Sequence, residues 1–247
     1  MKQDKLFITS FIGNILVFLL VLAGTIVMMT IGSGALAENS LSVFKYFTFQ
    51  SNIFMGIVAF IYGYYQLLML LNKKDKIPHV LLVFNHVGVA AVGLTFLIVI
   101  LFLAPGYGFD KMYNNANLFF HALVPIFAMI NYLFFEKECR IKFIETLFTI
   151  IPPLSYGIVY FIVVASQNAY GNLKIDFYGF GAKGPVVGAF NFLVVVSIAY
   201  AIGLLLFFIN RLVFKKYING VENKIWEGNS WQSTFPNCNT NLFHNVL

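Results

Sequence analysis

Charged residues are scarce in this chain of 247 residues: Asp, Glu, Lys and Arg make up 11% of it, whereas hydrophobic residues make up 60%. The apolar residues come in runs of about 18 or more, which is typical of membrane-spanning helices and not of soluble domains. Segments of strictly alternating hydrophobicity, which a membrane β-barrel needs, are lacking. The sequence therefore predicts an all-α, polytopic membrane protein.

Windows of about 20 residues predict one bundle of six transmembrane helices within residues 1–216. The predicted spans are 6–30, 44–71, 80–104, 117–135, 143–166 and 186–213. The first span precedes Ala35-Leu36-Ala37, which imitates a signal cleavage site, but its apolar run is too long for a signal peptide, so we expect a retained helix. Residues 217–247 are polar, lack apolar periodicity and are predicted to be a disordered cytoplasmic tail.

Lysine and arginine gather on one side of the predicted membrane. If the amino terminus is cytoplasmic, twelve of the 16 cations fall on the inner side. The four on the outer side are Lys45, Lys111, Lys174 and Lys183. This bias predicts that both termini are cytoplasmic. It also explains the net charge of +6 by cations that flank lipid headgroups, so no nucleic acid partner is implied. Cys139 and Cys238 then lie on the inner side, where a disulfide is not expected.

Acidic side chains are missing from the centres of the predicted spans, because Glu145 lies near an inner edge and the other nine acids lie in loops or tails. Ion-coupled transporters usually carry a buried carboxylate, so this absence weighs against a transporter without excluding one. The chain also has no Gly-rich phosphate loop and no Cys/His cluster with metal-ligand spacing. We therefore expect no cofactor and no metal.

Two histidines, His86 and His121, lie within predicted spans, where each is either a functional residue or a hydrogen-bonded packing residue. At 1.5 Å per residue, His86 lies about 9 Å from the inner edge and His121 about 6 Å below the outer edge of a core about 30 Å thick. About 15 Å then separates them along the membrane normal. This separation disfavours a shared metal and a haem held between them.

Polar side chains gather at the outer end of the second span, in the segment Phe47-Thr48-Phe49-Gln50-Ser51-Asn52. Thr48 lies about 6 Å below the outer edge, the same depth as His121. Ser51 and Asn52 follow Thr48 by three and four residues, so all three share a helix face that should point into the bundle.

The fourth span carries two further features beside His121. Asn117 lies four residues before it, on the same helix face. Pro125 lies four residues after it and has no N–H, so we expect the carbonyl of His121 to lose its helical donor and the helix to kink. The site should therefore offer a free acceptor and room for a substrate or water.

The pair Thr48 and His121 predicts acyl transfer. A Thr hydroxyl becomes a nucleophile when a base takes its proton, and neutral imidazole suits that task near neutral pH. We expect Thr48 to attack an ester carbonyl, His121 to act as base and then as acid, and Ser51, Asn52 or Asn117 to donate to the oxyanion. No carboxylate orients the imidazole in this prediction.

Three alternatives stay open. Thr48 could be a back-bonded packing residue, as is common in membrane helices. A small permease or channel would use the polar face as a conduction path, with Pro152-Pro153 as a gating kink. A lipid-binding protein without catalysis would keep the pocket alone. A transporter predicts a continuous polar lining and a hydrolase a polar cluster at one depth; polar residues thin out between Asn52 and Tyr62, which favours the hydrolase.

The longest predicted outer loop, residues 167–185, is rich in glycine and aromatic residues. Such a loop is either a lid over the outer face of the bundle or an interfacial aromatic belt.

The Phe47-to-Asn52 segment and the segment Asn117-Leu118-Phe119-Phe120-His121-Ala122-Leu123-Val124-Pro125 resemble those of the bacterial Pr6Pr family. Its distant relatives are the androgen-induced and androgen-dependent tissue-factor-pathway-inhibitor-regulating membrane proteins. The resemblance implies a six-helix bundle in a bacterial cell membrane. From the animal relatives it implies a threonine hydrolase of fatty acid esters of hydroxy fatty acids, with the nucleophile at Thr48 and the catalytic histidine at His121.

The predicted orientation can be tested with single cysteines in a background that lacks Cys139 and Cys238. Cysteines at Asn114 and Asn172 should react with an impermeant thiol reagent added from outside, because both lie in outer loops. A cysteine at Lys74 should react only after the membrane is opened. Labelling of Lys74→Cys in sealed cells would reverse the orientation.

Overall fold

The structure, a computed structural model, describes residues 5–32, 41–136 and 141–226. Ala35-Leu36-Ala37, Cys139, Cys238 and residues 227–247 lie outside the described residues. Within the described ranges all regular structure is helical, and six segments are long and apolar enough to cross a membrane. The predicted fold class, an all-α bundle of six spans, is confirmed.

The described helices combine into six spans with short connections. The spans are α1 (Lys5–Thr30), α2 (Phe47–Leu70), His79–Tyr107 with α3 (His79–Ile98), Ala116–Phe135 with α7 (Val124–Ile130), Phe143–Ser166 with α8 (Ile151–Ser166), and Pro185–Phe214 in α9 (Pro185–Trp226). The short helices η1 (Leu41–Lys45), α4 (Ala104–Tyr107) and α5 (Phe109–Met112) lie between or at the ends of spans. No predicted span boundary differs from these spans by more than 3 residues. Helix α9 continues to Trp226, so the first part of the segment predicted to be disordered is helical.

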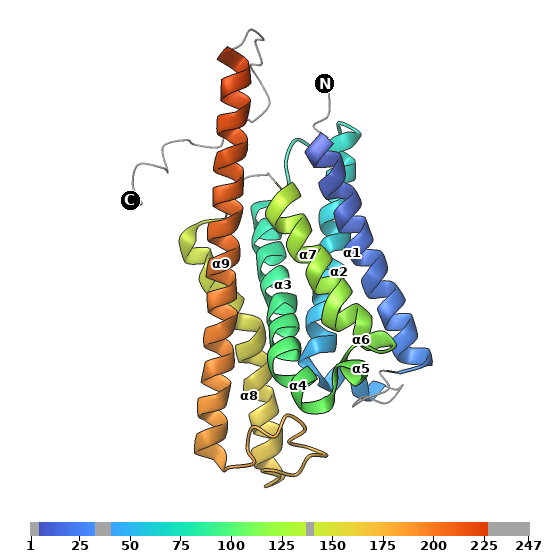
Figure 1. The fold of residues 1–247 in the computed structure, drawn as a ribbon, viewed down its shortest axis with the longest axis vertical. Coiled ribbons are helices and arrows are strands. Elements are labelled where there is room, and N and C mark those ends of the chain that lie inside the picture. Colours follow the sequence, from blue (N-terminus) through green and yellow to red (C-terminus); the bar gives the residue numbers. More distant parts are fainter. Residues whose placement is uncertain (1–4, 33–40, 137–140, 227–247) are drawn as a thin grey trace.

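Helix α3 lies at the centre of the bundle. It packs against α2 and α7 on one side and α9 on the other, and α8 pairs with α9 (Figure 1). The run from Val87 to Leu94 is fully buried and consists of valine, alanine, glycine and one leucine. Small side chains let neighbouring helices approach closely, which is how membrane helices associate when lipid is as apolar as the core. Exposed Ile12, Ile26 and Ile162 on the outer surface fit contact with lipid.

Apolar side chains are buried along the whole bundle, whereas buried polar side chains gather toward its two ends. The end where α2 begins, here called the pocket end, holds Thr48 and His121. The middle layer is apolar and contains Val17, Val21, Met55, Ala59, Val89, Val92, Val124 and Ala128. The opposite end, here called the Lys5 end, holds six buried polar residues, here called the Glu136 cluster: Ser10, Asn14, Gln66, Asn85, Asn131 and Glu136. In the described residues an apolar layer therefore separates two polar layers.

Several spans change helix type along their length. The fourth span contains two π-helical segments, η3 (Phe119–Leu123) and η4 (Asn131–Phe135), on either side of α7. The fifth span begins as a 3₁₀ helix, η5 (Phe143–Ile150), and becomes the α-helix α8 where Pro152 and Pro153 occupy its first turn. Proline is tolerated in a first turn, where its missing N–H has no helical acceptor in any case. The proline pair thus marks a change of helix type.

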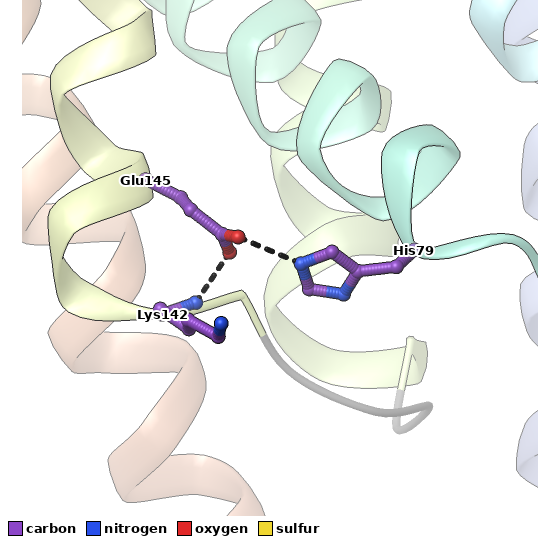
Figure 2. A network of polar contacts seen from close by, with 3 residues as sticks. All are labelled: His79, Lys142 and Glu145. Carbon is purple, nitrogen blue, oxygen red and sulfur yellow. Dashed lines mark hydrogen bonds and ion pairs between the residues drawn. The ribbon is translucent and has the colours of Figure 1, made fainter.

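Glu145 fastens the start of η5 to the start of α3 at the Lys5 end (Figure 2). Its Oε2 accepts a hydrogen bond from the backbone N–H of Lys142 at 2.6 Å, and its Oε1 lies 2.8 Å from Nε2 of His79. One carboxylate therefore caps one helix and ties it to the first residue of another.

The contact between α8 and α9 depends on Gly157. A Cβ at this position would lie 1.8 Å from Cε2 of the Phe192 ring, so Gly157→Ala forces the ring to turn away. Overpacking of this kind costs about 1–3 kcal/mol. We expect a lower midpoint of thermal unfolding in detergent.

Gly106→Ala is the matched control, because nothing lies within 4 Å of a Cβ at that position. Its midpoint should stay close to that of the parent. Equal midpoints for the two variants would contradict the packing of α8 on α9.

Candidate functional site

The pocket end of the bundle contains a cavity of about 80 Å³. Its volume suffices for several waters or an ester group. Its lining residues are Met28, Val43, Tyr46, Thr48, Phe49, Leu103, Tyr107, Met112, Asn117, Phe120, His121, Phe177 and Tyr178. Thr48, Asn117 and His121, which the sequence singled out, therefore line the same cavity.

Thr48 lies in the first turn of α2, just after the N-cap residue Tyr46. The N–H groups of a first turn have no acceptor within their helix, and the helix dipole is positive at this end. The neighbouring N–H of Phe47 donates to the hydroxyl of Tyr178 at 3.1 Å. The start of α2 thus places a half-buried hydroxyl and a positive helix end at the cavity wall.

The imidazole of His121 is oriented by a backbone carbonyl. Its Nδ1 lies 2.6 Å from the carbonyl oxygen of Met112 in α5. A carbonyl can only accept, so in the neutral ring Nδ1 carries the hydrogen and Nε2 keeps its lone pair. Asn117 Nδ2 donates to the carbonyl of Lys111 at 3.1 Å, which fastens the same short helix to the fourth span. His121 is thereby held in the tautomer that a general base requires.

The π-helical segment around His121 leaves one carbonyl without a helical donor. The N–H of Val124 donates to the carbonyl of Phe119, and Pro125 has no N–H. The carbonyl of Phe120 is therefore satisfied from outside its helix, by Asn52 Nδ2 at 3.2 Å. The sequence predicted a freed carbonyl at His121, four residues before Pro125; the carbonyl to which the structure gives an outside donor is that of Phe120. Single π-helical turns of this kind are frequent at functional sites.

Ser51 and Asn52 hold the backbone of the site and do not line the cavity. Asn52 Nδ2 also donates to the carbonyl of Thr48 at 2.7 Å, and Ser51 Oγ donates to the same carbonyl at 3.1 Å. Ser51 Oγ further lies 3.2 Å from the hydroxyl of Thr95 on α3. Among the three predicted oxyanion donors, Asn117 is the one that lines the cavity.

The loop between α8 and α9 covers one side of the cavity with Phe177 and Tyr178. It folds around the buried carboxylate of Asp176, which accepts hydrogen bonds from the hydroxyl of Tyr160 and from the N–H groups of Gly171 and Gly181. Burial raises the pKa of Tyr178 to about 12, so its hydroxyl stays protonated at neutral pH and can donate as well as accept. Of the two expectations for this loop, its contact with the cavity favours the lid.

Within the described residues, no hydrogen bond joins the Thr48 hydroxyl to His121. Both side chains border the same cavity, so a substrate group or a water in it can contact both. Contacts between catalytic groups often lengthen when no substrate is bound. Direct hydrogen-bond reach between the two side chains stays a prediction.

The Glu136 cluster was missed by the sequence analysis, which found no buried carboxylate and counted that absence against an ion-coupled transporter; Glu136 removes this argument. Glu136 directly follows the fourth span and is only 7% exposed. It accepts hydrogen bonds from the amides of Asn14, Asn85 and Asn131. Asn14, Asn85 and Asn131 all lie within predicted spans at matching depths. These three amides were the signal in the sequence that could have indicated the cluster.

His86 belongs to the Lys5 end and not to the cavity. It is completely buried, and its Nδ1 lies 2.8 Å from the hydroxyl of Tyr132. The two histidines thus have different neighbours at different ends of the bundle. In the part of the chain that the structure describes, no three His, Cys, Asp or Glu side chains gather in a way that could hold a metal ion.

Comparison of the chain with protein-family models, with curated proteins and with solved structures finds no match.

Asn52→Leu tests the link between α2 and the fourth span. The substitution removes the donor of the Phe120 carbonyl, and a buried polar group left unsatisfied costs about 1–3 kcal/mol. We expect a lower midpoint of thermal unfolding in detergent. Ser51→Ala is the control, because the Thr48 carbonyl keeps its Asn52 donor, and it should cost less. A greater loss for Ser51→Ala than for Asn52→Leu would contradict this assignment.

Proposed function

We propose that this chain is an integral membrane hydrolase that cleaves lipophilic, fatty acyl esters, with Thr48 as the nucleophile and His121 as the base. We also propose, on the two segments that resemble it, membership of the Pr6Pr family and location in a bacterial cell membrane. The observation that carries the chemistry is a shared cavity in which the Met112 carbonyl leaves Nε2 of His121 unprotonated. A hydroxyl and an unprotonated imidazole that border one cavity can both reach an ester bound in it, as nucleophilic catalysis requires.

In the first step, Oγ1 of Thr48 attacks the carbonyl carbon of the ester while its proton passes to Nε2 of His121. The tetrahedral intermediate then collapses, the bond to the alcohol oxygen breaks, and His121 returns the proton to the leaving alcohol. The product is an acyl ester on Thr48. In the second step, His121 takes a proton from water as the water oxygen attacks the carbonyl carbon of that ester. The second tetrahedral intermediate then collapses, the bond to Oγ1 of Thr48 breaks, His121 returns the proton to Oγ1, and the fatty acid is released.

The negative oxygen of each tetrahedral intermediate needs hydrogen-bond donors. The N-terminal end of α2 supplies a positive helix dipole beside Thr48, and Asn117 supplies an amide at the cavity wall. Loss of one oxyanion donor typically lowers the rate by about 10²–10³-fold. Asn52 and Ser51 act on the backbone carbonyl of Thr48 in this proposal, and so position the nucleophile instead of contacting the substrate.

The remaining walls of the cavity support a lipophilic substrate. They are largely apolar, with Met28, Val43, Leu103 and Phe120 among them. Phe177 and Tyr178 of the loop cover one side and reduce the water around the ester. A dry site strengthens the electrostatic contacts to a developing charge.

A permease or channel is less well supported. It requires a continuous polar lining, whereas Val17, Met55, Val89 and Val124 belong to an apolar layer between the two polar layers. A lipid-binding protein without catalysis fits the same cavity, and turnover separates it from a hydrolase.

Substitution of the proposed pair tests the function. In detergent or liposomes the parent should hydrolyse lipophilic esters, and Thr48→Ala or His121→Ala should each lower the rate by about 10²-fold or more. The double variant should be no slower than either single variant, because nucleophile and base act as a unit. Thr48→Ser keeps the hydroxyl and should retain a measurable rate.

His86→Ala is the matched control at the other end of the bundle, and should lower stability while turnover per folded molecule is kept. A fluorophosphonate should label Thr48 covalently, and the adduct can be located by mass spectrometry. If Thr48→Ala hydrolyses esters as fast as the parent, the hydrolase proposal is wrong, and the permease or the lipid-binding function takes its place.

A further inference from the structure

The Glu136 cluster brings one carboxylate into contact with three other segments of the bundle. Oε1 of Glu136 accepts from Asn14 of α1 at 3.2 Å and from Asn131 of η4 at 3.0 Å, and Oε2 accepts from Asn85 of α3. Gln66 of α2 extends the cluster, since its Oε1 accepts from Asn14 at 3.1 Å. A carboxylate is rarely buried in a membrane bundle unless it has a function.

Each of the three asparagines has a second polar atom that the fold leaves unsatisfied. Among the described residues, the Oδ1 atoms of Asn14, Asn85 and Asn131 have no hydrogen-bond partner, and these residues are 1%, 1% and 3% exposed. Buried acceptors are nearly always satisfied in proteins, so three of them around one carboxylate require an explanation.

Rotation of a side-chain amide by half a turn exchanges its oxygen with its nitrogen. If the three amides rotate, three carbonyl oxygens face the carboxylate of Glu136. Oxygens repel one another unless a cation lies between them, and carboxylate and amide oxygens are the ligands that hard cations prefer. For Asn14 the rotation also gives up the hydrogen bonds to the carbonyl of Ser10 at 3.2 Å and to Oε1 of Gln66, so these two oxygens would face the same ion. The same side chains can therefore form either an amide-bound carboxylate or an all-oxygen cation site.

We propose that the Glu136 cluster binds one alkali metal cation through Glu136 and the amide oxygens of Asn14, Asn85 and Asn131. Protein sites for divalent cations usually gather several carboxylates, whereas this cluster contains one, so the charge fits a monovalent ion. The site does not rest on the proposed hydrolase activity, because the apolar layer separates it from the cavity with Thr48.

Gly13 supports the position of Asn131. A Cβ on residue 13 would lie 2.2 Å from Oδ1 of Asn131, so the missing side chain is what admits this amide between α1 and the fourth span. The amide then reaches both α1 and the carboxylate of Glu136.

Thermal unfolding of the purified full chain in detergent tests the site. The midpoint should rise with the concentration of NaCl or KCl when choline chloride keeps the ionic strength constant, because an ion that binds only the folded state stabilises it. Choline is too large for the cluster and serves as the reference cation. In Glu136→Gln the apparent affinity for the ion should fall by about tenfold or more.

Glu145→Gln is the matched control, since Glu145 is a second carboxylate at the Lys5 end that lies outside the cluster. Its midpoint of thermal unfolding should rise with Na⁺ or K⁺ as that of the parent does. If Glu136→Gln does not fold, Asn85→Leu, which removes one oxygen ligand, takes its place with the same expected loss of affinity.

A direct measurement of the bound ion tests the site in the parent protein, without any variant. Radioactive ²²Na⁺ or ⁸⁶Rb⁺, the latter as a stand-in for K⁺, should be retained at about one ion per chain and displaced by the unlabelled salt. Midpoints that are equal in NaCl, KCl and choline chloride, together with no retained ion, would overturn the proposal. A salt response that persists unchanged in Glu136→Gln would also overturn it, because the ion would then bind elsewhere.

Discussion

The hydrogen bond from Asn52 to the carbonyl of Phe120 joins the two halves of the candidate site. It exists because a backbone carbonyl inside a membrane bundle must find a donor within the protein. Val124 donates to a different carbonyl and Pro125 has no N–H, so the fourth span cannot satisfy this group by itself. The same amide also bonds the carbonyl of Thr48. One side chain therefore positions the backbones on which both proposed catalytic residues lie.

The apolar middle layer divides the bundle into two ends with different chemistry. At the pocket end, helix termini, a short helix and a loop meet, and they leave a cavity between them. At the Lys5 end, long helices run side by side, and their polar side chains contact one another. Loops and helix ends leave space and backbone donors, whereas continuous helices bring side chains together. This difference explains why the pocket end holds a cavity and the Lys5 end holds polar side chains that contact one another.

The sequence predicted what depends on local properties. Span length and apolarity located the six helices, and the rise of a helix per residue placed Thr48 and His121 at one depth. It did not predict the role of the Met112 carbonyl, because that contact depends on how α5 folds back on the fourth span. Helical spacing also cannot show that Asn52 turns to a carbonyl of its own helix instead of to the cavity. Glu136 was assigned to a loop because it follows the last apolar residue, and only packing against α1 and α3 buries it.

The contact between Gly13 and Asn131 constrains how this protein can diverge. Any side chain at position 13 displaces the amide of Asn131, which is one of three that hold the carboxylate of Glu136. Gly13 does not contact Glu136, yet the two positions are coupled through the amide of Asn131. A side chain at position 13 is therefore expected to weaken one of the three amide hydrogen bonds to Glu136, so a change at one helix surface alters the environment of a carboxylate that it does not contact.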